Sequence, residues 1–279
     1  MADTSRPVSF FHRAVSRLKM AIYIYLSYTP KGFRRNIRAF RFGIPLVLKR
    51  SRYTVSTESE ALNFLHSTNL DLPIPRVWDS LDIDGENWTL MSMVPGITLY
   101  SLLMRHELSD DELQCVFNDL LLLVKKLWTI RQRDYPQFPQ GMIMCSASGQ
   151  GLPDHGECYE LRGPLPALQH YANRAYYANG EEELLKEHPE LAQLVSNDEI
   201  VWVHCDLRST NIVVDKGRLS GVVDWEASGW QPRHWQLMVC RPAVMTNQGP
   251  IANAWKRAVF DSDVEEAYNA GVAIINDFV

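Results

Sequence analysis

The sequence predicts an α+β protein with a small, sheet-rich N-terminal part and a larger, mainly helical C-terminal part. Three observations support this prediction. Short β-branched and aromatic runs occur before residue 94 and again over residues 200–223. Apolar residues at helical spacing dominate the chain between them, most clearly after Ser109. The 279 residues, 46% of them hydrophobic, are enough for one large or two small domains with a substantial core.

The N-terminal 30 residues contain an apolar repeat at near-helical spacing: Phe10, Phe11, Val15, Leu18, Ile22 and Leu26. We expect an amphipathic helix whose apolar face packs on the small N-terminal part. The alternative is a membrane-surface helix, which the basic residues Arg13, Arg17 and Lys19 favour. The basic stretch of residues 31–41 has no clear periodicity. It predicts a solvated loop, with contact to a phosphate as the alternative.

The next segment predicts a strand over residues 44–49 that ends in the cation Lys49. A helix is expected to begin near Thr57, and Thr57 and Glu60 have the spacing of a capping box. A turn at residues 82–85 precedes a second strand over residues 88–94. We place the boundary between the two parts here, which gives one unit of residues 1–94 and another of residues 95–279.

The C-terminal part begins with a strong helix start. Ser109 is followed by three acidic residues, which favour the positive end of a helix, and by a long apolar face. Gly163 and Pro164 are expected to open a second helix that runs through Tyr177, and a third helix begins at residues 181–183. Four aromatic residues are expected among later helical stretches: Trp230, Trp235, Trp255 and Tyr268.

Residues 201–225 contain the residues that indicate chemistry. The apolar runs 211–214 and 219–223 flank a turn at Lys216 and Gly217, which predicts a β-hairpin. Counting from the turn places Asn211 opposite Val222, with Asp224 just beyond. Asp206, in the loop that enters the same end, can join them. Two carboxylates and a carboxamide suit Mg²⁺, which prefers oxygen ligands and keeps positions open for phosphate oxygens.

The spacing His204-x-Asp206-x4-Asn211, with Asp224 thirteen residues later, resembles the catalytic loop and metal-binding Asp of the kinase fold. The continuation from Asp224-Trp225-Glu226 to Pro232 resembles the aminoglycoside phosphotransferase-like (phosphotransferase enzyme) family, especially its fungal members. The resemblance extends from about Phe42 to about Trp235. It implies a two-lobed, protein-kinase-like fold that uses ATP and Mg²⁺.

The resemblance also implies roles for the residues of the loop and hairpin. Asp206 is the expected catalytic base, His204 a buried organiser of the loop, and Asn211 and Asp224 the magnesium ligands. Arg208, permanently charged and two residues after the base, is expected to contact the transferring phosphate. The acceptor is expected to be a hydroxyl of a small molecule, in a pocket near the loop around Asp154.

In the N-terminal part the resemblance implies a nucleotide site. Lys49 is expected to hold the ATP phosphates and to pair with a helix glutamate, with Glu58 preferred and Glu60 as the competitor. Backbone groups of Ser92 and Val94 are expected to bind adenine, with Met91 as a wall of the pocket. Only Gly32 and Gly43 precede Lys49. The phosphate cover is therefore expected to be short or built from the basic residues 34–41.

Three departures from the family pattern keep other functions open. Cys205 stands where the family has Gly, Gln236 where an acid often follows the Trp, and Arg208 where His or another residue is usual. One alternative is a catalytically impaired kinase-fold module that binds nucleotide and regulates. A protein kinase is less favoured, because Asp-Phe-Gly and Ala-Pro-Glu sequences are absent.

Composition limits the partners and the compartment. A net charge of −5 without a long Lys/Arg run argues against a nucleic-acid partner. Five widely spaced cysteines without a Cys-x-x-Cys pair indicate a reducing compartment, so a cytoplasmic protein is expected. The longest N-terminal apolar run, from Met20 to Leu26, is too short to span a bilayer, so no integral membrane segment is expected. The acceptor and the oligomeric state are left open.

Overall fold

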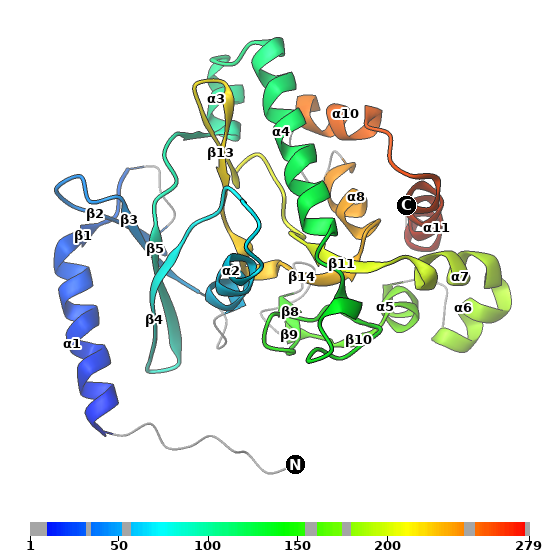
Figure 1. Ribbon diagram of the computed structural model, residues 1–279, viewed down its shortest axis with the longest axis horizontal. Coiled ribbons are helices and arrows are strands. Elements are labelled where there is room, and N and C mark those ends of the chain that lie inside the picture. The colour runs from blue at the N-terminus through cyan, green and yellow to red at the C-terminus, as the bar shows by residue number, and fades with distance from the viewer. Residues whose placement is uncertain are drawn as a thin grey trace.

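The computed structural model describes residues 10–31, 35–51, 57–153, 161–174, 180–242 and 249–276. A sheet-bearing part lies at one end and a helical part at the other (Figure 1). The described helices are α1 (Phe10–Leu26), α2 (Thr57–Ser67), α3 (Leu99–Arg105), α4 (Asp110–Trp128), α5 (Ala167–Arg174), α6 (Glu181–Glu187), α7 (Pro189–Asn197), α8 (Trp235–Cys240), α10 (Gly249–Arg257) and α11 (Ser262–Asn276), with 3-10 turns η1 (Gln132–Asp134) and η2 (Trp225–Ala227).

The N-terminal sheet is antiparallel with the strand order β1-β2-β3-β5-β4. Its strands are β1 (Ser27–Tyr28), β2 (Ile37–Phe40), β3 (Leu46–Arg50), β4 (Val77–Ile83) and β5 (Glu86–Ser92). The turn that joins β4 to β5 has Asp84 and Gly85 at positive φ, 55° and 81°, which is the geometry of a tight hairpin turn. The two expected strands therefore form, although the second begins two residues earlier and ends two residues earlier than predicted.

The helix predicted at the N-terminus forms as α1, but it does not bury the face that we expected. Val15, Leu18 and Ile22 are 38%, 64% and 47% exposed. The helix instead contacts the sheet through Met20 and Tyr23, which belong to a cluster built on sheet residues. Among the members of the repeat whose side chains the structure describes, Leu26 alone packs against this cluster. The apolar repeat therefore predicted the helix correctly but not most of its buried face.

The basic stretch expected to be a loop contains strand β2 instead. Its arginines are used by the fold: Arg38 donates to the Ser27 hydroxyl at 2.9 Å and to the carbonyls of Ile24 and Ser27. Arg41 donates to the Ser27 carbonyl at 3.4 Å. These carbonyls lie at the C-terminal end of α1, where a helix leaves acceptors unsatisfied. The solvated-loop prediction is therefore wrong for residues 37–40.

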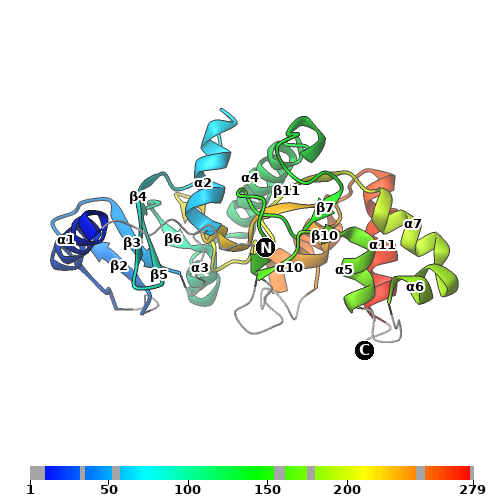
Figure 2. The same ribbon diagram turned by 90° about the horizontal axis from the view of Figure 1, so that it is seen from below.

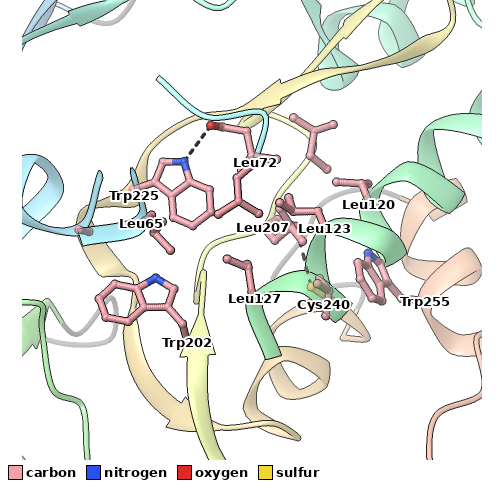
Figure 3. Close-up of a cluster of buried hydrophobic side chains, with 14 of the residues drawn as sticks. Leu65, Leu72, Leu120, Leu123, Leu127, Trp202, Leu207, Trp225, Cys240 and Trp255 are labelled. Atoms are coloured by element: carbon pink, nitrogen blue, oxygen red, sulfur yellow. Dashed lines mark hydrogen bonds between the residues drawn. The ribbon is translucent and has the colours of Figure 1, made fainter. Parts of the chain in front are cut away.

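The C-terminal part is built around α4, which begins as predicted. The Ser109 hydroxyl accepts from the Glu112 backbone N–H, and the Glu112 carboxylate accepts from the Ser109 N–H, so a capping box closes the helix start. The apolar face of α4 packs into the main core. Figure 3 shows this core, in which side chains from both parts of the chain meet: Leu65, Leu72, Leu120, Leu123, Leu127, Trp202, Leu207, Trp225, Cys240 and Trp255.

The short strands of the C-terminal part differ from two predictions. Its strands are β6 (Ile97–Thr98), β7 (Met142–Ile143), β8 (Leu152–Pro153), β9 (Leu161–Arg162), β10 (Leu165–Pro166), β11 (Ile200–Val203), β12 (Ile212–Asp215), β13 (Arg218–Val222) and β14 (Gly229–Pro232). The helix expected from Gly163 begins only at Ala167, because residues 165–166 pair with β7. Tyr177 lies outside the described residues. Trp230 lies in β14, which pairs with β11, and not in a helix.

The predicted hairpin forms, with a register one residue different from the expected one. Lys216 and Gly217 take positive φ values of 51° and 72° at the turn. Val214 pairs with Leu219, but Val213 pairs with Gly221, so a bulge shifts the rest of the ladder. Ile212 is consequently opposite Val222, and Val223 donates to the Asn211 carbonyl at 2.9 Å.

Two further observations concern the composition-based expectations. Among the described residues no helix is both long and apolar enough to cross a membrane. The four cysteines in the described ranges, Cys115, Cys145, Cys205 and Cys240, are all free thiols. The boundary expected at Val94 lies in the connection between β5 and β6, and the division into two units stays a prediction.

Candidate active site

The hairpin and the preceding loop bring Asp206, Asn211 and Asp224 to one end of the C-terminal part. Asn211 donates its amide hydrogens to the Asp206 carboxylate Oδ2 and to the Asp206 carbonyl, both at 2.9 Å. Its side-chain oxygen is therefore turned away from Asp206. The bulge in the hairpin places Asn211 beside Val223, next to Asp224 in the chain. The structure thus brings together the three residues that the spacing singled out.

His204 is fully buried and hydrogen-bonded to both the loop and the hairpin. Its Nε2 lies 3.2 Å from the Val223 carbonyl, and its Nδ1 accepts the backbone N–H of Asp206 at 3.2 Å. Since a carbonyl can only accept, Nε2 must carry the hydrogen and Nδ1 the lone pair. The ring also packs edge-on against Trp225 at 4.4 Å. His204 therefore joins the loop that carries Asp206 to the end of the hairpin.

Two departures from the family pattern have visible structural consequences. Cys205 has φ of 54°, a conformation that glycine adopts without steric cost. Burial raises the pKa of the Cys205 thiol, so the thiol stays protonated. Gln236 accepts the His204 backbone N–H at 3.3 Å and donates to the Cys240 sulfur at 3.2 Å. The uncharged side-chain amide of Gln236 thus binds the backbone of the loop at His204.

Arg208 lies against the expected base. Its Nε donates to the Asp206 carboxylate Oδ1, and the Arg208 side chain remains 35% exposed. Both carboxylate oxygens of Asp206 thus have donors, one from Arg208 and one from Asn211. Because the Arg208 side chain is partly exposed, it can also meet an incoming anion.

Lys49 of β3 lies within reach of three carboxylates. Its Nζ is 2.9 Å from Glu58 Oε2, 2.5 Å from Asp224 Oδ1 and 3.3 Å from Glu226 Oε2. Glu58 also accepts the Trp225 backbone N–H at 3.1 Å, so α2 is tied to the segment after the hairpin. Glu60, the competitor for Lys49, is not among these partners.

The charges of this cluster do not balance, and the pKa values reflect this. Burial disfavours the Lys49 ammonium, but attraction by the carboxylates outweighs burial and raises the pKa of Lys49. Burial also raises the pKa of Glu58, to about 7; Lys49 opposes the rise, while repulsion from Asp224 and Glu226 adds to it. One ammonium group thus lies among three carboxyl groups, so the electrostatics of the site favour binding of a further cation.

The pKa of Glu58 leads to a testable prediction about stability. Because this pKa is raised in the folded protein, the stability gained by holding the proton is complete at low pH and is lost as pH rises from about 4 to 7. Glu58→Gln removes the titration. As the pH rises from 4.5 to 8, we expect the free energy of unfolding of the variant to increase relative to that of wild type by at least about 1 kcal/mol. This corresponds to a relative increase of a few degrees in the melting temperature.

Thermal melts of the nucleotide-free protein across this pH range test the prediction. Glu86→Gln serves as the control, because Glu86 is exposed and pairs with Arg50 outside the cluster. A difference between Glu58→Gln and wild type that stays constant with pH, or that falls, would contradict the charge imbalance.

The expected adenine contacts lie at the end of β5. Met91 is buried in the main core, while Ser92 and Val94 are partly exposed. The Ser92 N–H donates to the Arg76 carbonyl at 2.9 Å. The Ser92 N–H is therefore already bonded within the fold, so the backbone group of Ser92 that remains for adenine is its carbonyl. Asp154, expected near the acceptor pocket, lies outside the described residues.

The donor set fits a hard cation that brings its own oxygen ligands. Asn211 offers an amide oxygen and Asp224 a carboxylate, and Mg²⁺ commonly takes one or two such ligands together with phosphates and water. Within the described ranges no three His, Cys, Asp or Glu side chains are grouped to hold an ion by themselves. The residues therefore suit a metal that arrives with a nucleotide.

Two features were missed by sequence reasoning. Glu226, in the middle of η2, reaches Lys49, and its spacing of two residues from Asp224 was the available signal. A buried network joins Tyr171, His234 and Asp198: Tyr171 Oη lies 2.6 Å from His234 Nε2, and His234 Nδ1 lies 2.7 Å from Asp198. It ties α5 to the start of α8, and no short-range pattern connects residues so far apart in the chain.

Comparisons with known proteins show the family and the fold of the chain. The sequence matches the phosphotransferase enzyme family over residues 31–269. No curated protein matches the chain. Solved structures similar to it include aminoglycoside-3'-phosphotransferase of type VIII, at 14% identity and a TM-score of 0.56, covering 95% of this chain and 99% of that one.

Two liganded structures are also similar. One is APH(2")-IIa in a ternary complex with streptomycin and ATP, at 16% identity and a TM-score of 0.53, covering 99% of this chain and 87% of that one. The other is a thermostable mutant of the aminoglycoside phosphotransferase APH(4)-Ia with ADP and hygromycin B, at 15% identity and a TM-score of 0.52, covering 95% and 99%.

The antiparallel N-terminal sheet, the helical C-terminal part and these neighbours define the fold of the two-lobed, kinase-like phosphotransferases. The chain belongs to the phosphotransferase enzyme family. That it is a fungal-type member stays a prediction.

Proposed function

We propose that the protein transfers the γ-phosphoryl group of ATP to a hydroxyl of a small molecule, with Mg²⁺ as cofactor. The observation that carries the proposal is the convergence of Asp206, Asn211 and Asp224 with Lys49, which β3 and the hairpin bring to one place. Phosphoryl transfer depends mainly on positioning and charge neutralisation, so few groups are needed.

In this proposal each residue has one task. Asp206 accepts the proton of the acceptor hydroxyl, whose oxygen forms a bond to the γ-phosphorus while the bond to the β-phosphate oxygen breaks and ADP leaves. Asn211 and Asp224 hold Mg²⁺, which neutralises charge on the phosphates. Lys49 is held by Glu58 and contacts the α and β phosphates. Arg208 turns partly away from Asp206 and contacts the transferring phosphoryl group.

The nucleotide would lie against the end of β5. Ser92 offers its carbonyl and Val94 its N–H to adenine, and Met91 lies behind them. This placement is supported by the sheet register, in which β3 pairs with β5 from Leu46 opposite Ser92 to Arg50 opposite Trp88. Lys49 and the adenine contacts are thus at opposite ends of adjacent strands, as an extended nucleotide requires.

The acceptor is a small molecule in this proposal, because two of the similar structures hold the small molecules streptomycin and hygromycin B. The test is a screen of hydroxyl compounds with ATP labelled at the γ-position, including aminoglycosides, sugars and a generic protein substrate. Label transferred to a small molecule in a Mg²⁺-dependent manner supports the proposal. Transfer only to protein would favour a protein kinase instead.

A second candidate is a kinase-fold module that binds nucleotide without consuming it. The observation in its favour is that both oxygens of Asp206 already accept hydrogen bonds, from Arg208 and Asn211. Tight binding of Mg²⁺-ATP with no ADP formed over hours would favour this candidate.

The position of the basic residues predicts how the phosphates are covered. The connection between β1 and β2 lies at the Lys49 end of the sheet, since Ile37 pairs with Lys49 and Arg50 donates to the Asn36 carbonyl at 2.8 Å. Lys31 and Arg35 in this connection are exposed. Exposed cations are screened by salt more than backbone amides are. We expect Mg²⁺-ATP affinity to fall steeply with ionic strength.

Calorimetric titration at low and high salt checks this expectation. Arg35→Ala should weaken binding roughly three- to tenfold at low salt and reduce the salt dependence. Arg38→Ala is the matched control, because Arg38 holds carbonyls at the end of α1 and should alter stability but not the salt dependence. Binding that is indifferent to salt and to Arg35→Ala would show that other groups hold the phosphates.

A further inference from the structure

Helix α2, which carries Glu58, lies between the N-terminal sheet and the C-terminal part (Figures 1 and 2). Leu62 and Leu65 of this helix are fully buried in the main core, in the cluster that also contains Trp202 and Trp225. The sheet has a separate cluster of buried side chains, and among the described residues none from α2 belongs to it. The apolar side of α2 therefore packs on the core of the C-terminal part.

Phe64 lies at the centre of an aromatic cluster that joins α2 to the C-terminal part. The centroid of its ring is 4.6 Å from that of Trp202 in β11 and 5.6 Å from that of Trp230 in β14. The rings of Tyr135 and Phe138, which follow η1, lie at 5.3 and 5.7 Å. All four separations are within the range of favourable aromatic pairs. Phe64 thus links α2 to two strands that pair with each other.

Those two strands lead to and from the residues proposed for chemistry. Strand β11 runs into the loop that carries Asp206, and β14 follows η2, which comes directly after Asp224. Trp202 and Trp230 are register partners across the two strands. The position of Phe64 is therefore defined relative to the same backbone that carries Asp206 and Asp224.

Glu58 is a second attachment of α2 to this backbone. Its Oε1 accepts the Trp225 N–H at 3.1 Å, while its Oε2 lies 2.9 Å from Lys49 Nζ. Glu58 and Phe64 are six residues apart, so about 9 Å of helix separates the two attachments. Two attachments at this separation fix the direction of α2 as well as its position.

The chain that leaves α2 is also bonded to the C-terminal part. The Pro73 carbonyl accepts the Val222 N–H of the hairpin at 2.9 Å. Lys126 of α4 donates to the Asp71 carbonyl at 2.5 Å. The helix and the segment after it are therefore held by the C-terminal part on both sides of Phe64.

We propose that Phe64 is a positioning residue, which fixes α2 against β11 and β14 so that Glu58 holds Lys49 in place before nucleotide binds. The proposal rests on the proposed function, in which Lys49 contacts the phosphates. In protein kinases the position of the corresponding helix controls whether such a Lys–Glu pair forms. In this protein a movement of α2 would expose Leu62 and Leu65 and separate the aromatic rings. The pair is therefore assembled permanently.

Calorimetric titration with Mg²⁺-ATP tests the proposal without requiring turnover. Phe64→Ala removes the ring and should weaken binding roughly tenfold, because α2 then spends less time in the position that holds Lys49. Phe64→Met keeps apolar contact with the surrounding rings and should recover most of the affinity. Phe260→Ala is the matched control. Phe260 is also partly buried and contacts two tryptophans, Trp128 and Trp255, so its variant should lose stability but keep the affinity.

A double-mutant cycle shows whether Phe64 acts through Glu58. If it does, Phe64→Ala should weaken Mg²⁺-ATP binding much less in a Glu58→Gln background than in the wild type. Equal losses of affinity in both backgrounds would make the role of Phe64 merely structural and overturn the proposal. Wild-type affinity in Phe64→Ala would overturn it as well.

Hydrogen exchange of the nucleotide-free protein gives a readout that is independent of the proposed function. We expect the amides of α2 to exchange about as slowly as those of β11 in the wild type, and Phe64→Ala to speed exchange selectively in α2. Fast exchange of α2 in the wild type, slowed only by Mg²⁺-ATP, would overturn the proposal. If the protein transfers no phosphate, the proposed function fails, while protected α2 amides that Phe64→Ala releases would still support the anchoring of α2.

Discussion

Asp206→Asn is expected to lower the rate of phosphoryl transfer roughly 10²- to 10⁴-fold while the affinity for ATP stays nearly unchanged. Asparagine has the shape of aspartate, and its one side-chain oxygen can still accept from Asn211, which bonds Asp206 Oδ2 at 2.9 Å, while Arg208, which is partly exposed, turns to solvent. The loop should therefore keep its conformation. What the variant loses is the ability to accept a proton. Turnover and ATP titration, measured on the same preparation, separate the two effects.

Asp215→Asn provides the matched control for this substitution. Asp215 is exposed at the turn end of the same hairpin, far from the cluster around Lys49. Its variant should retain full activity and affinity. An Asp206→Asn protein as active as wild type would remove Asp206 from the role of base.

Asp224→Ala is expected to abolish Mg²⁺-dependent binding of ATP without unfolding the protein. The substitution removes one of three carboxylates around Lys49, and Glu58 and Glu226 remain to pair with that cation. Alanine is strained at the φ of 68° found here, so a loss of about 1 kcal/mol in stability should accompany it. Titration of ATP with and without Mg²⁺ measures the binding, and a thermal melt measures the fold.

A second variant separates the carboxylate from the backbone strain. Asn tolerates the left-handed conformation, so Asp224→Asn should keep the wild-type melting temperature and still lose most of the metal-dependent affinity. Wild-type Mg²⁺-ATP affinity in both variants would place the metal elsewhere.

The sequence was a good guide where the signal is local. The hairpin turn, the start of α4 and the loop from His204 to Asn211 each follow from residues close together in the chain. The fold class follows too, since short β-branched runs and long helical repeats are separated clearly along the chain. Asp206, Asn211 and Asp224 could be chosen because their order and spacing match a known pattern.

Features set by tertiary contacts could not be predicted. The bulge between Val213 and Val214 shifts the hairpin register, and nothing in the alternation of residues 211–223 marks it. The buried face of α1 depends on Asp79 and Asp84, which are more than fifty residues away. The sequence alone predicts that Arg38 is a surface cation, because its bond to the Ser27 carbonyl forms only when the end of α1 packs beside β2.

The central claim is that the groups around Asp206 and Asp224 transfer phosphate from Mg²⁺-ATP to a hydroxyl. A single-turnover experiment with γ-labelled ATP and excess enzyme tests it without knowledge of the acceptor, because water itself is a slow hydroxyl acceptor. The account predicts Mg²⁺-dependent release of labelled phosphate by the wild type, at least about tenfold faster than by Asp206→Asn. Bound Mg²⁺-ATP that stays intact in the wild type, as in the variant, would contradict it.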